Sequence, residues 1–375
     1  MTTTGSLILA IVVSGGVVLS APFVGQIRAA LRAAFPGRFV AIVGGAVALT
    51  IGLAVVAALA RIRLPRAQPD EASRGDRRGG RYGAIAAAIL IGTAYISRFS
   101  TGNPEVDAVE RVHFVQYGLV TLLFYRAWRN RGDLSSLILP VLAGLIVGTI
   151  EEWFQWFLPV RVGEARDVFL NLVAIACGLL FSLGLDPPSG FAPRLQPGSA
   201  RLMTRLASAF ALVFAMFFHA VHLGVEVEAE SIGSFKSRFD HPTLAALAID
   251  RAGRWKNQPP VVLRRLSRED QYMDEGLWHV RRRNDAWSAQ DFFTAWRENR
   301  ILEEFFGPVL DTPSYVSKSG HRWSPEQRAD AERRAAGDTR PYVSDAEPRP
   351  ILIMSKTAFW SLAAGLIVVL SAYHR

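Results

Sequence analysis

The sequence predicts an all-α fold: a polytopic transmembrane helical bundle of about eight spans, with a mainly helical soluble insert before the last span. Half of the 375 residues are hydrophobic, although the formal net charge is +9. The charges are kept apart from the apolar runs, and no charged residue lies before Arg28, between Arg38 and Arg61, or between Arg205 and Glu226. Such runs are long enough to cross a bilayer core of roughly 30 Å. Backbone amides in hydrocarbon must bond within their own segment, so each span is expected to be a helix.

The predicted spans cover approximately 6–25, 39–60, 82–98, 112–128, 135–157, 167–185, 206–225 and 351–373. The first resembles a cleaved signal peptide, but it lacks a basic leading segment and its apolar run of about 18 residues favours a retained span. The third and fourth spans are the shortest. Between the first two, Gln26–Arg38 fits either a short interfacial helix ending before Pro36 or an ordinary polar turn.

Charge in the short loops predicts the orientation of these spans. Lys and Arg are retained in the cytoplasm, and with eight spans they favour the side that holds both termini by roughly two to one. We therefore expect both termini to be cytoplasmic and residues 226–350 to be extracytoplasmic. Loss of one span would reverse this orientation for part of the chain.

The insert at 226–350 contains residues that are typical of the starts and ends of helices. Asp240 with Pro242 predicts one helix, Ser288 predicts the start of a second that stops at Gly307, and Ser324 with Pro325 and Gln327 predicts a third. The resulting division of the chain is 1–81 (two helices and a basic loop), 82–185 (four helices), 186–225 (loop and seventh helix), 226–350 (insert) and 351–375 (last helix).

Basic residues flank apolar runs rather than interleaving with aromatic residues on one face, so we expect no nucleic-acid partner and expect membrane lipids instead. Cys177 is the single cysteine and lies in an apolar run, so it has no intrachain disulfide partner. His219 and His222, with Glu226 or His113, have residue types that bind zinc. Two histidines at helix spacing are more often buried hydrogen-bonding residues, so we expect no metal and no cofactor.

Polar residues gather in 107–178, near the ends of neighbouring spans. They are His113, Tyr117, Glu152, Gln155, Arg161, Asp167 and Asn171. Spacings of three or four place each pair on one helix face. Ionisable groups near a membrane boundary are costly unless they are paired or wet, so this set is a candidate site. The alternative is a structural network that fixes how the helices pack.

The spacing of three, six, six and four from Glu152 through Gln155, Arg161 and Asp167 to Asn171, followed by Gly178, resembles the VanZ-like family of membrane proteins. The resemblance covers about 82–185. It implies a bacterial envelope protein of the inner (plasma) membrane, in a family named after a protein associated with low-level teicoplanin resistance. It does not imply a particular reaction. Ala174 departs from the glycine usual in the family, and the additional acid Glu151 leaves open which carboxylate faces the network.

Three functions follow as hypotheses, of which we expect the first, with the other two as alternatives. The first is binding of an anionic lipid-linked or envelope ligand at the outer side of the bundle, with Arg161 meeting the anion. The second is a structural or accessory subunit, in which exposed aromatic residues of 226–350 dock on a partner membrane protein. The third is a membrane enzyme acting on a phosphorylated lipid or cell-wall precursor, with Glu152 or His113 as general base. In the insert, His279 beside Arg281–Arg283, like Asp240 with His241, favours solvated surface over an acid–base or anion site.

Overall fold

The computed structural model describes residues 3–64, 74–158, 163–188, 190–258, 260, 271–314 and 317–372. The chain divides into two compact units. The helical unit comprises Met1–Gln155, Gly163–Phe217 and Leu362–Arg375, and the mixed unit comprises Trp156–Val162 and Phe218–Ser361. We describe each by itself.

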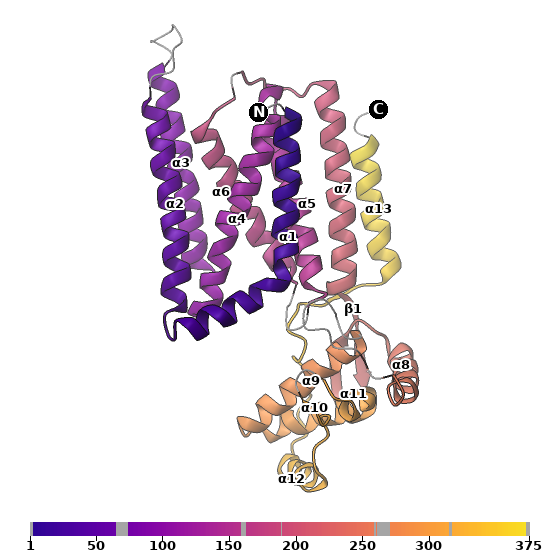
Figure 1. Cartoon of the computed structure of the whole chain (residues 1–375). Helices are drawn as coiled ribbons and strands as arrows, with labels where there is room; N and C mark the ends of the chain where they lie inside the picture. Colours follow the sequence, from indigo (N-terminus) through magenta and orange to yellow (C-terminus); the bar gives the residue numbers. More distant parts are fainter. Residues whose placement is uncertain are drawn as a thin grey trace. The chain divides into compact units, whose positions relative to one another are not determined.

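Long helices build the helical unit (Figure 1). They are α1 (Thr3–Ala34), α2 (Phe39–Arg63), α3 (Arg74–Arg98), α4 (Pro104–Trp128), α5 (Ser135–Gln155), α6 (Ala165–Leu185), α7 (Pro197–His222) and α13 (Lys356–Ala372), with the short 3-10 turn η1 (Arg129–Arg131) after α4. Among the described residues, five helices are long and apolar enough to cross a membrane: α1, α2, α5, α6 and α7. This agrees with an integral membrane protein. Helices also cover the third and fourth expected spans, although α3 and α4 carry more charge. The expected last span, 351–373, is only partly correct, because residues 352–353 form a strand and the shorter helix α13 begins at Lys356.

The segment after the first expected span is helical and continuous with it. Helix α1 runs for 32 residues and contains Pro22. A bend is visible in this helix (Figure 1), and proline favours a bend because it lacks the N–H that would continue the helix. The last turns of α1 are tied down by Glu105, whose Oε2 lies 3.0 Å from Arg28 Nη2 and also pairs with Arg32.

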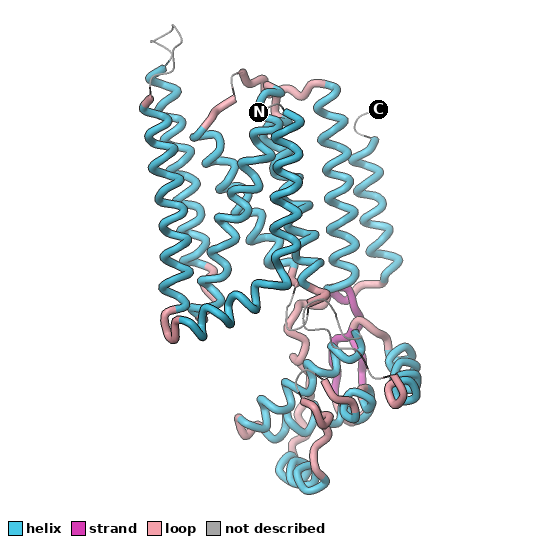
Figure 2. Tube along the Cα trace, in the orientation of Figure 1, coloured by secondary structure: helices cyan, strands magenta, loops and turns pink. Residues whose placement is uncertain are grey.

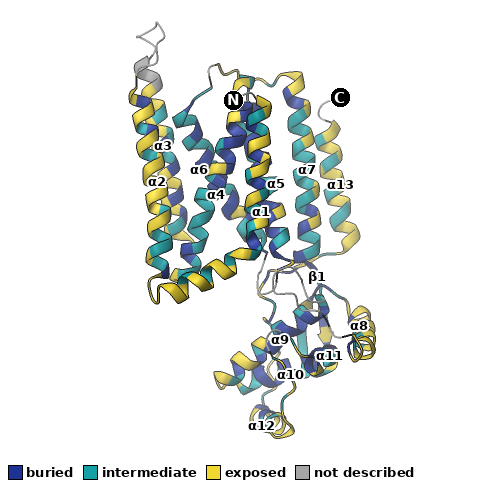
Figure 3. Cartoon of the chain, viewed as in Figure 1, coloured by how far each residue is buried: buried dark blue, intermediate teal, exposed yellow. Residues whose placement is uncertain are grey.

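Small residues allow α4, α5 and α6 to pack closely. A Cβ added to Gly178 on α6 would lie 2.8 Å from the Cα of Gly118 on α4, so the backbones of these helices meet here, as at other small-residue contacts in membranes. Buried residues concentrate in these helices, whereas α2 is largely exposed (Figure 3). Leu49 and Val56 of α2 are each 64% exposed, as expected of side chains that face lipid.

The mixed unit holds a three-stranded sheet (Figure 2). Its strands are β1 (Leu223–Ala229), β2 (Gly233–Ser237) and β3 (Leu352–Ile353), in the order β2-β1-β3. β1 pairs antiparallel with β2, with Val225 opposite Ser237, and parallel with β3, with Leu223 opposite Leu352. This sheet was not predicted from the sequence. The expected seventh span reached residue 225, because Leu223 and Val225 continue an apolar run, but the helix ends at His222 and a strand begins at Leu223.

The helices of the mixed unit are α8 (His241–Arg254), α9 (Gln271–Ser288), α10 (Phe292–Phe305), α11 (Gly307–Asp311) and α12 (Pro325–Ala335). The expected caps of α8 and α12 are confirmed: Asp240 accepts from Thr243 N and Ser324 accepts from Gln327 N. The expected cap of the second helix is wrong. Ser288 is the last residue of α9, and the cap of α10 is Asp291.

Helix α9 was not predicted, because charged residues interrupt its apolar stripe. Tyr272, Met273, Leu277 and Val280 of α9 join Leu302 and Phe306 in the core of the mixed unit. The aromatic residues that the sequence analysis expected at the surface are also internal, since Trp296 is 9% and Phe305 is 3% exposed. These two side chains therefore do not provide the exposed docking surface that was expected.

Candidate functional site

Five polar residues lie together inside the helical unit. Tyr117 comes from α4, Glu151, Glu152 and Gln155 come from the last turns of α5, and Asn171 comes from α6. We call this set the polar cluster. Tyr117, Glu152 and Asn171 are 0% exposed, Gln155 is 2% and Glu151 is 5% exposed.

Hydrogen bonds join these side chains within and between helices. Tyr117 Oη donates to Glu151 Oε2 at 2.8 Å, which links α4 to α5. Gln155 Nε2 donates to Glu151 Oε1 at 2.8 Å and to Glu152 Oε1 at 3.3 Å. Gln155 lies four and three residues after these acids, so the single amide bridges both carboxylates on one helix face. These hydrogen bonds hold the side chains at the end of α5 together and join this helix to α4.

A glycine brings α6 up to this point. A Cβ on Gly148 of α5 would lie 3.1 Å from Asn171 Nδ2 and 3.4 Å from Tyr117 Cε1. The absent side chain is what lets Asn171 reach the α4–α5 contact. Within the described part of the chain, neither Nδ2 nor Oδ1 of Asn171 has a hydrogen-bond partner, although both atoms are buried. A buried amide without partners is unfavourable by about 1–3 kcal/mol, so this position suits a further polar group.

The remaining expected residues have different relationships to the cluster. The His113 ring packs edge-on against that of Tyr117, with 6.1 Å between centroids. Asp167 lies in the first turn of α6, and its electrostatic neighbours include Glu110 and Tyr95. Arg161 lies outside the described residues. The structure thus brings together Tyr117, Gln155, Glu152 and Asn171 with His113 beside them.

Glu151, a member of the polar cluster, and Gly148, which borders the cluster, were not part of the candidate site expected from the sequence. Glu151 accepts the hydrogen bond from Tyr117, while Glu152 is also buried, so both carboxylates face the interior. The signal for Glu151 was its spacing of four from Gln155, which places the two on one face. Gly148 could be found only from the three-dimensional approach of α6.

The other two histidines considered as metal ligands, His219 and His222, contact residues of the segment 350–360. His222 Nδ1 lies 2.9 Å from the carbonyl oxygen of Pro350, and Trp360 Nε1 donates to His219 Nδ1 at 3.3 Å. In the described ranges, no group of three or more His, Cys, Asp or Glu side chains is placed to hold a metal ion.

The expectation that His279 and Arg283 are solvated is wrong. His279 is 4% and Arg283 is 2% exposed. His279 Nδ1 lies 2.6 Å from Glu298 Oε2, and Arg283 donates to the Asn299 side chain and to the His321 carbonyl. Burial lowers the pKa of Arg283 to about 10. Their partners come from distant segments, which sequence spacing does not indicate.

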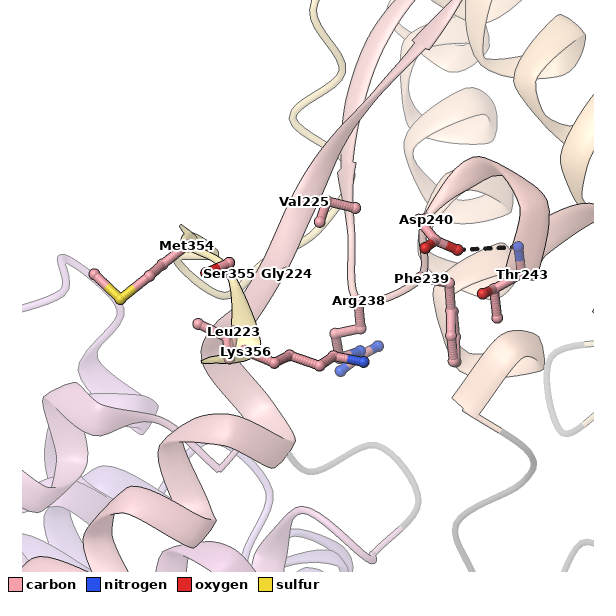
Figure 4. Close-up of a pocket in the computed structure, with 10 residues that line it drawn as sticks. All are labelled: Leu223, Gly224, Val225, Arg238, Phe239, Asp240, Thr243, Met354, Ser355 and Lys356. Carbon is pink, nitrogen blue, oxygen red and sulfur yellow. Dashed lines mark hydrogen bonds between the residues drawn. The ribbon is translucent and has the colours of Figure 1, made fainter. Parts of the chain in front are cut away.

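A pocket of about 260 Å³ lies in the mixed unit (Figure 4). Its walls come from the start of β1, the β2–α8 connection, the first turn of α8 and the start of α13. The lining residues are Leu223, Gly224, Val225, Arg238, Phe239, Asp240, Thr243, Met354, Ser355 and Lys356. Polar and apolar side chains therefore share one small concave surface.

No protein-family model, curated protein or solved structure matches this chain.

Proposed function

We propose that this chain is a VanZ-like integral membrane protein of the bacterial cell envelope with an accessory, non-catalytic role. In this proposal α3–α6 form a scaffold in the inner membrane, and the mixed unit is the extramembrane part that the scaffold anchors. The observation that carries the proposal is the burial of the polar cluster, whose side chains are directed at one another. The spacing from Glu152 to Asn171 is what supports the family assignment.

Burial argues against catalysis at the cluster. A general acid or base must come within hydrogen-bond reach of its substrate, whereas Tyr117 and Glu152 are 0% exposed. Hydrogen bonds between membrane helices stabilise packing by about 0.6 kcal/mol on average and up to about 2 kcal/mol. The Tyr117–Glu151 bond, which joins α4 to α5, accounts for these two polar residues without a reaction.

Eight crossings, with both termini in the cytoplasm and 226–350 outside, complete the proposal. Within the helical unit, the first turn of α1 and the last turn of α13 lie at the same end (Figure 1), as an even number of crossings requires. The excess of Arg in the loops assigned to that end supports a cytoplasmic location.

The test compares folding with phenotype. Tyr117→Phe and Glu151→Gln would be expressed in cells that lack the native chain, and Tyr82→Phe, whose residue is 37% exposed on α3, is the matched control. For each protein, the thermal unfolding midpoint in detergent and the teicoplanin susceptibility of the cells are measured. We expect loss of phenotype to follow loss of stability. A cluster variant with native stability that loses the phenotype would contradict a scaffold.

Binding of an anionic lipid-linked or envelope ligand at the outer end of the bundle is a second candidate. The observation that favours it is the buried amide of Asn171, which has no hydrogen-bond partner among the residues described. Asn171→Leu removes the amide while keeping similar volume. If the amide holds a ligand, this variant loses binding of a polyprenyl pyrophosphate in micelles. If the amide is only a packing residue, the variant binds unchanged and is more stable.

A further inference from the structure

The pocket of the mixed unit lies where two apolar helices join the sheet. β1 begins at Leu223, the residue after α7 ends, and α13 begins at Lys356, shortly after β3 ends at Ile353. Their adjoining ends contact each other within this unit, since the rings of Phe218 and Phe359 stack with 5.9 Å between centroids. Residues from both junctions, Leu223 and Lys356 among them, line the pocket. The pocket therefore lies where the apolar helices α7 and α13 meet the more polar residues of the mixed unit.

Helix α13 has the surface of a lipid-facing helix. Leu362, Leu366 and Val369 are 66%, 54% and 66% exposed. Phe359 and Trp360 lie near its start, and aromatic residues are enriched at the interface between hydrocarbon and water. An apolar helix that begins with aromatic residues beside the pocket favours a membrane lipid as its ligand.

The guanidinium group of Arg238 lines the pocket, and some of its N–H groups have no hydrogen-bond acceptor among the described residues. Its side chain is 4% exposed, and its Nε donates to Glu275 Oε1 at 2.8 Å. Nη1 and Nη2 are buried but donate no hydrogen bond to any residue in the described ranges. The carboxylates of Asp274 and Glu347 lie 3.7 Å and 3.6 Å from Nη2. A guanidinium carries five N–H donors, so donors remain for an acceptor that the described residues do not supply.

The other polar groups differ in charge. The side chain of Lys356 extends toward Arg238, and Asp240 bonds the backbone N–H of Thr243 (Figure 4). Asp240 and Lys356 are exposed, whereas Leu223 is buried and Phe239 and Met354 are partly buried. The pocket thus offers cations, one carboxylate and an apolar wall.

The charge balance selects the ligand. Arg238 and Arg349 share the carboxylates of Asp274 and Glu347, and Glu275 pairs with Arg238 as well, so three carboxylates surround two guanidinium groups. Asp240 adds a further negative charge to the lining. These carboxylates would repel a ligand with a net negative charge. A zwitterion has a negative group that can pair with the cations and a positive group that can pair with Asp240. We propose that the pocket binds the head group of a zwitterionic phospholipid, with its phosphate toward Arg238 and Lys356 and its ammonium toward Asp240.

The test uses native mass spectrometry of the full chain in mild detergent with added phosphatidylethanolamine, phosphatidylglycerol or soluble phosphoethanolamine. We expect phosphatidylethanolamine to be retained most strongly. Lys356→Gln is expected to weaken its retention about fivefold, because a charged partner of the phosphate is lost. Asp240→Asn is expected to weaken it about threefold, because asparagine still caps α8 but carries no charge.

Matched controls are Lys236→Gln on β2 and Asp285→Asn on α9, which remove exposed charges outside the pocket lining. Both should retain the lipid as the unchanged protein does. Equal retention by all four variants would overturn the assignment to this pocket. Stronger retention of phosphatidylglycerol would overturn the zwitterionic ligand, and displacement of the lipid by equimolar phosphoethanolamine would overturn the membrane source.

Discussion

The hydroxyl of Tyr117 on α4 donates a hydrogen bond to Glu151 Oε2 on α5 at 2.8 Å, where both residues are buried. A double-mutant cycle with Tyr117→Phe and Glu151→Gln should give a coupling free energy of about 0.5–2 kcal/mol, because each single change removes the same interhelical contact. The measurement is reversible unfolding in mixed micelles. Strict additivity of the two changes would show that the bond does not contribute to stability.

Gly178→Ala should destabilise the helical unit by about 1–3 kcal/mol, since the new methyl group forces backbones apart in a packed contact. The added Cβ would lie 2.8 Å from Gly118 Cα and 3.2 Å from Gly118 O. Gly16→Ala on α1 is the control, because nothing lies within 4 Å of its added Cβ. Thermal unfolding of both variants in the same detergent checks the prediction. A lower midpoint for Gly16→Ala than for Gly178→Ala would refute it.

Glu298→Gln should loosen the core of the mixed unit. The carboxylate accepts from Tyr342 Oη and Ser344 Oγ and lies 2.6 Å from His279 Nδ1. A glutamine oxygen can still accept from Tyr342 and Ser344, which both bond Oε1, but an NH₂ group then replaces the Oε2 atom that faces His279. An N–H at His279 Nδ1 would lose its acceptor, and an unsatisfied buried group is unfavourable by about 1–3 kcal/mol. Limited proteolysis of the full chain should therefore cleave this unit faster. Glu304→Gln, an exposed position on the same helix, should leave the cleavage rate unchanged.

The mixed unit should lose stability as the pH falls below 6.5. Burial, followed by the charge of Arg283, lowers the pKa of His321 from 6.5. The unfolded chain then binds a proton more readily than the folded chain, so the contribution of His321 is present at neutral pH and declines as pH falls through the unfolded value. Hydrogen exchange in α9 and α11, corrected for intrinsic rates, should accelerate from pH 7 to pH 5.

His321→Gln should reduce that acceleration, because glutamine does not titrate and the backbone carbonyl that accepts from Arg283 Nη2 is retained. His241→Gln is the control, at an exposed histidine of the same unit. The same acceleration in His321→Gln as in the unchanged protein would assign the pH response to another group.

The apolar runs predicted where the long helices lie, because hydrocarbon requires each segment to satisfy its own backbone. Asp240 and Ser324 were also identified as caps, since a cap depends on a few neighbouring residues. The strands were missed because β1 continues the apolar run of α7 without a polar break. Two residues of β3 provide too short a pattern to recognise.

Part of the candidate site could be predicted because Glu152, Gln155 and Asn171 stand at helix spacing near span ends. Glu151 was undecided, since adjacent residues on a helix point in different directions and only the position of Tyr117 shows that both acids face inward. Arg283 was misassigned for a related reason. A run of arginines favours solvent, and the Asn299 and His321 partners that allow burial are distant in sequence.

The pairing of Leu223 with Leu352 holds the entry and the exit of the mixed unit side by side. A segment whose two ends meet can be excised and replaced by a short linker without changing the distance that its flanking helices must bridge. The part of the unit between Leu223 and Leu352 is thus a cassette set into a connection between two apolar helices. Its length and content can change while α7 and α13 keep the same attachment points.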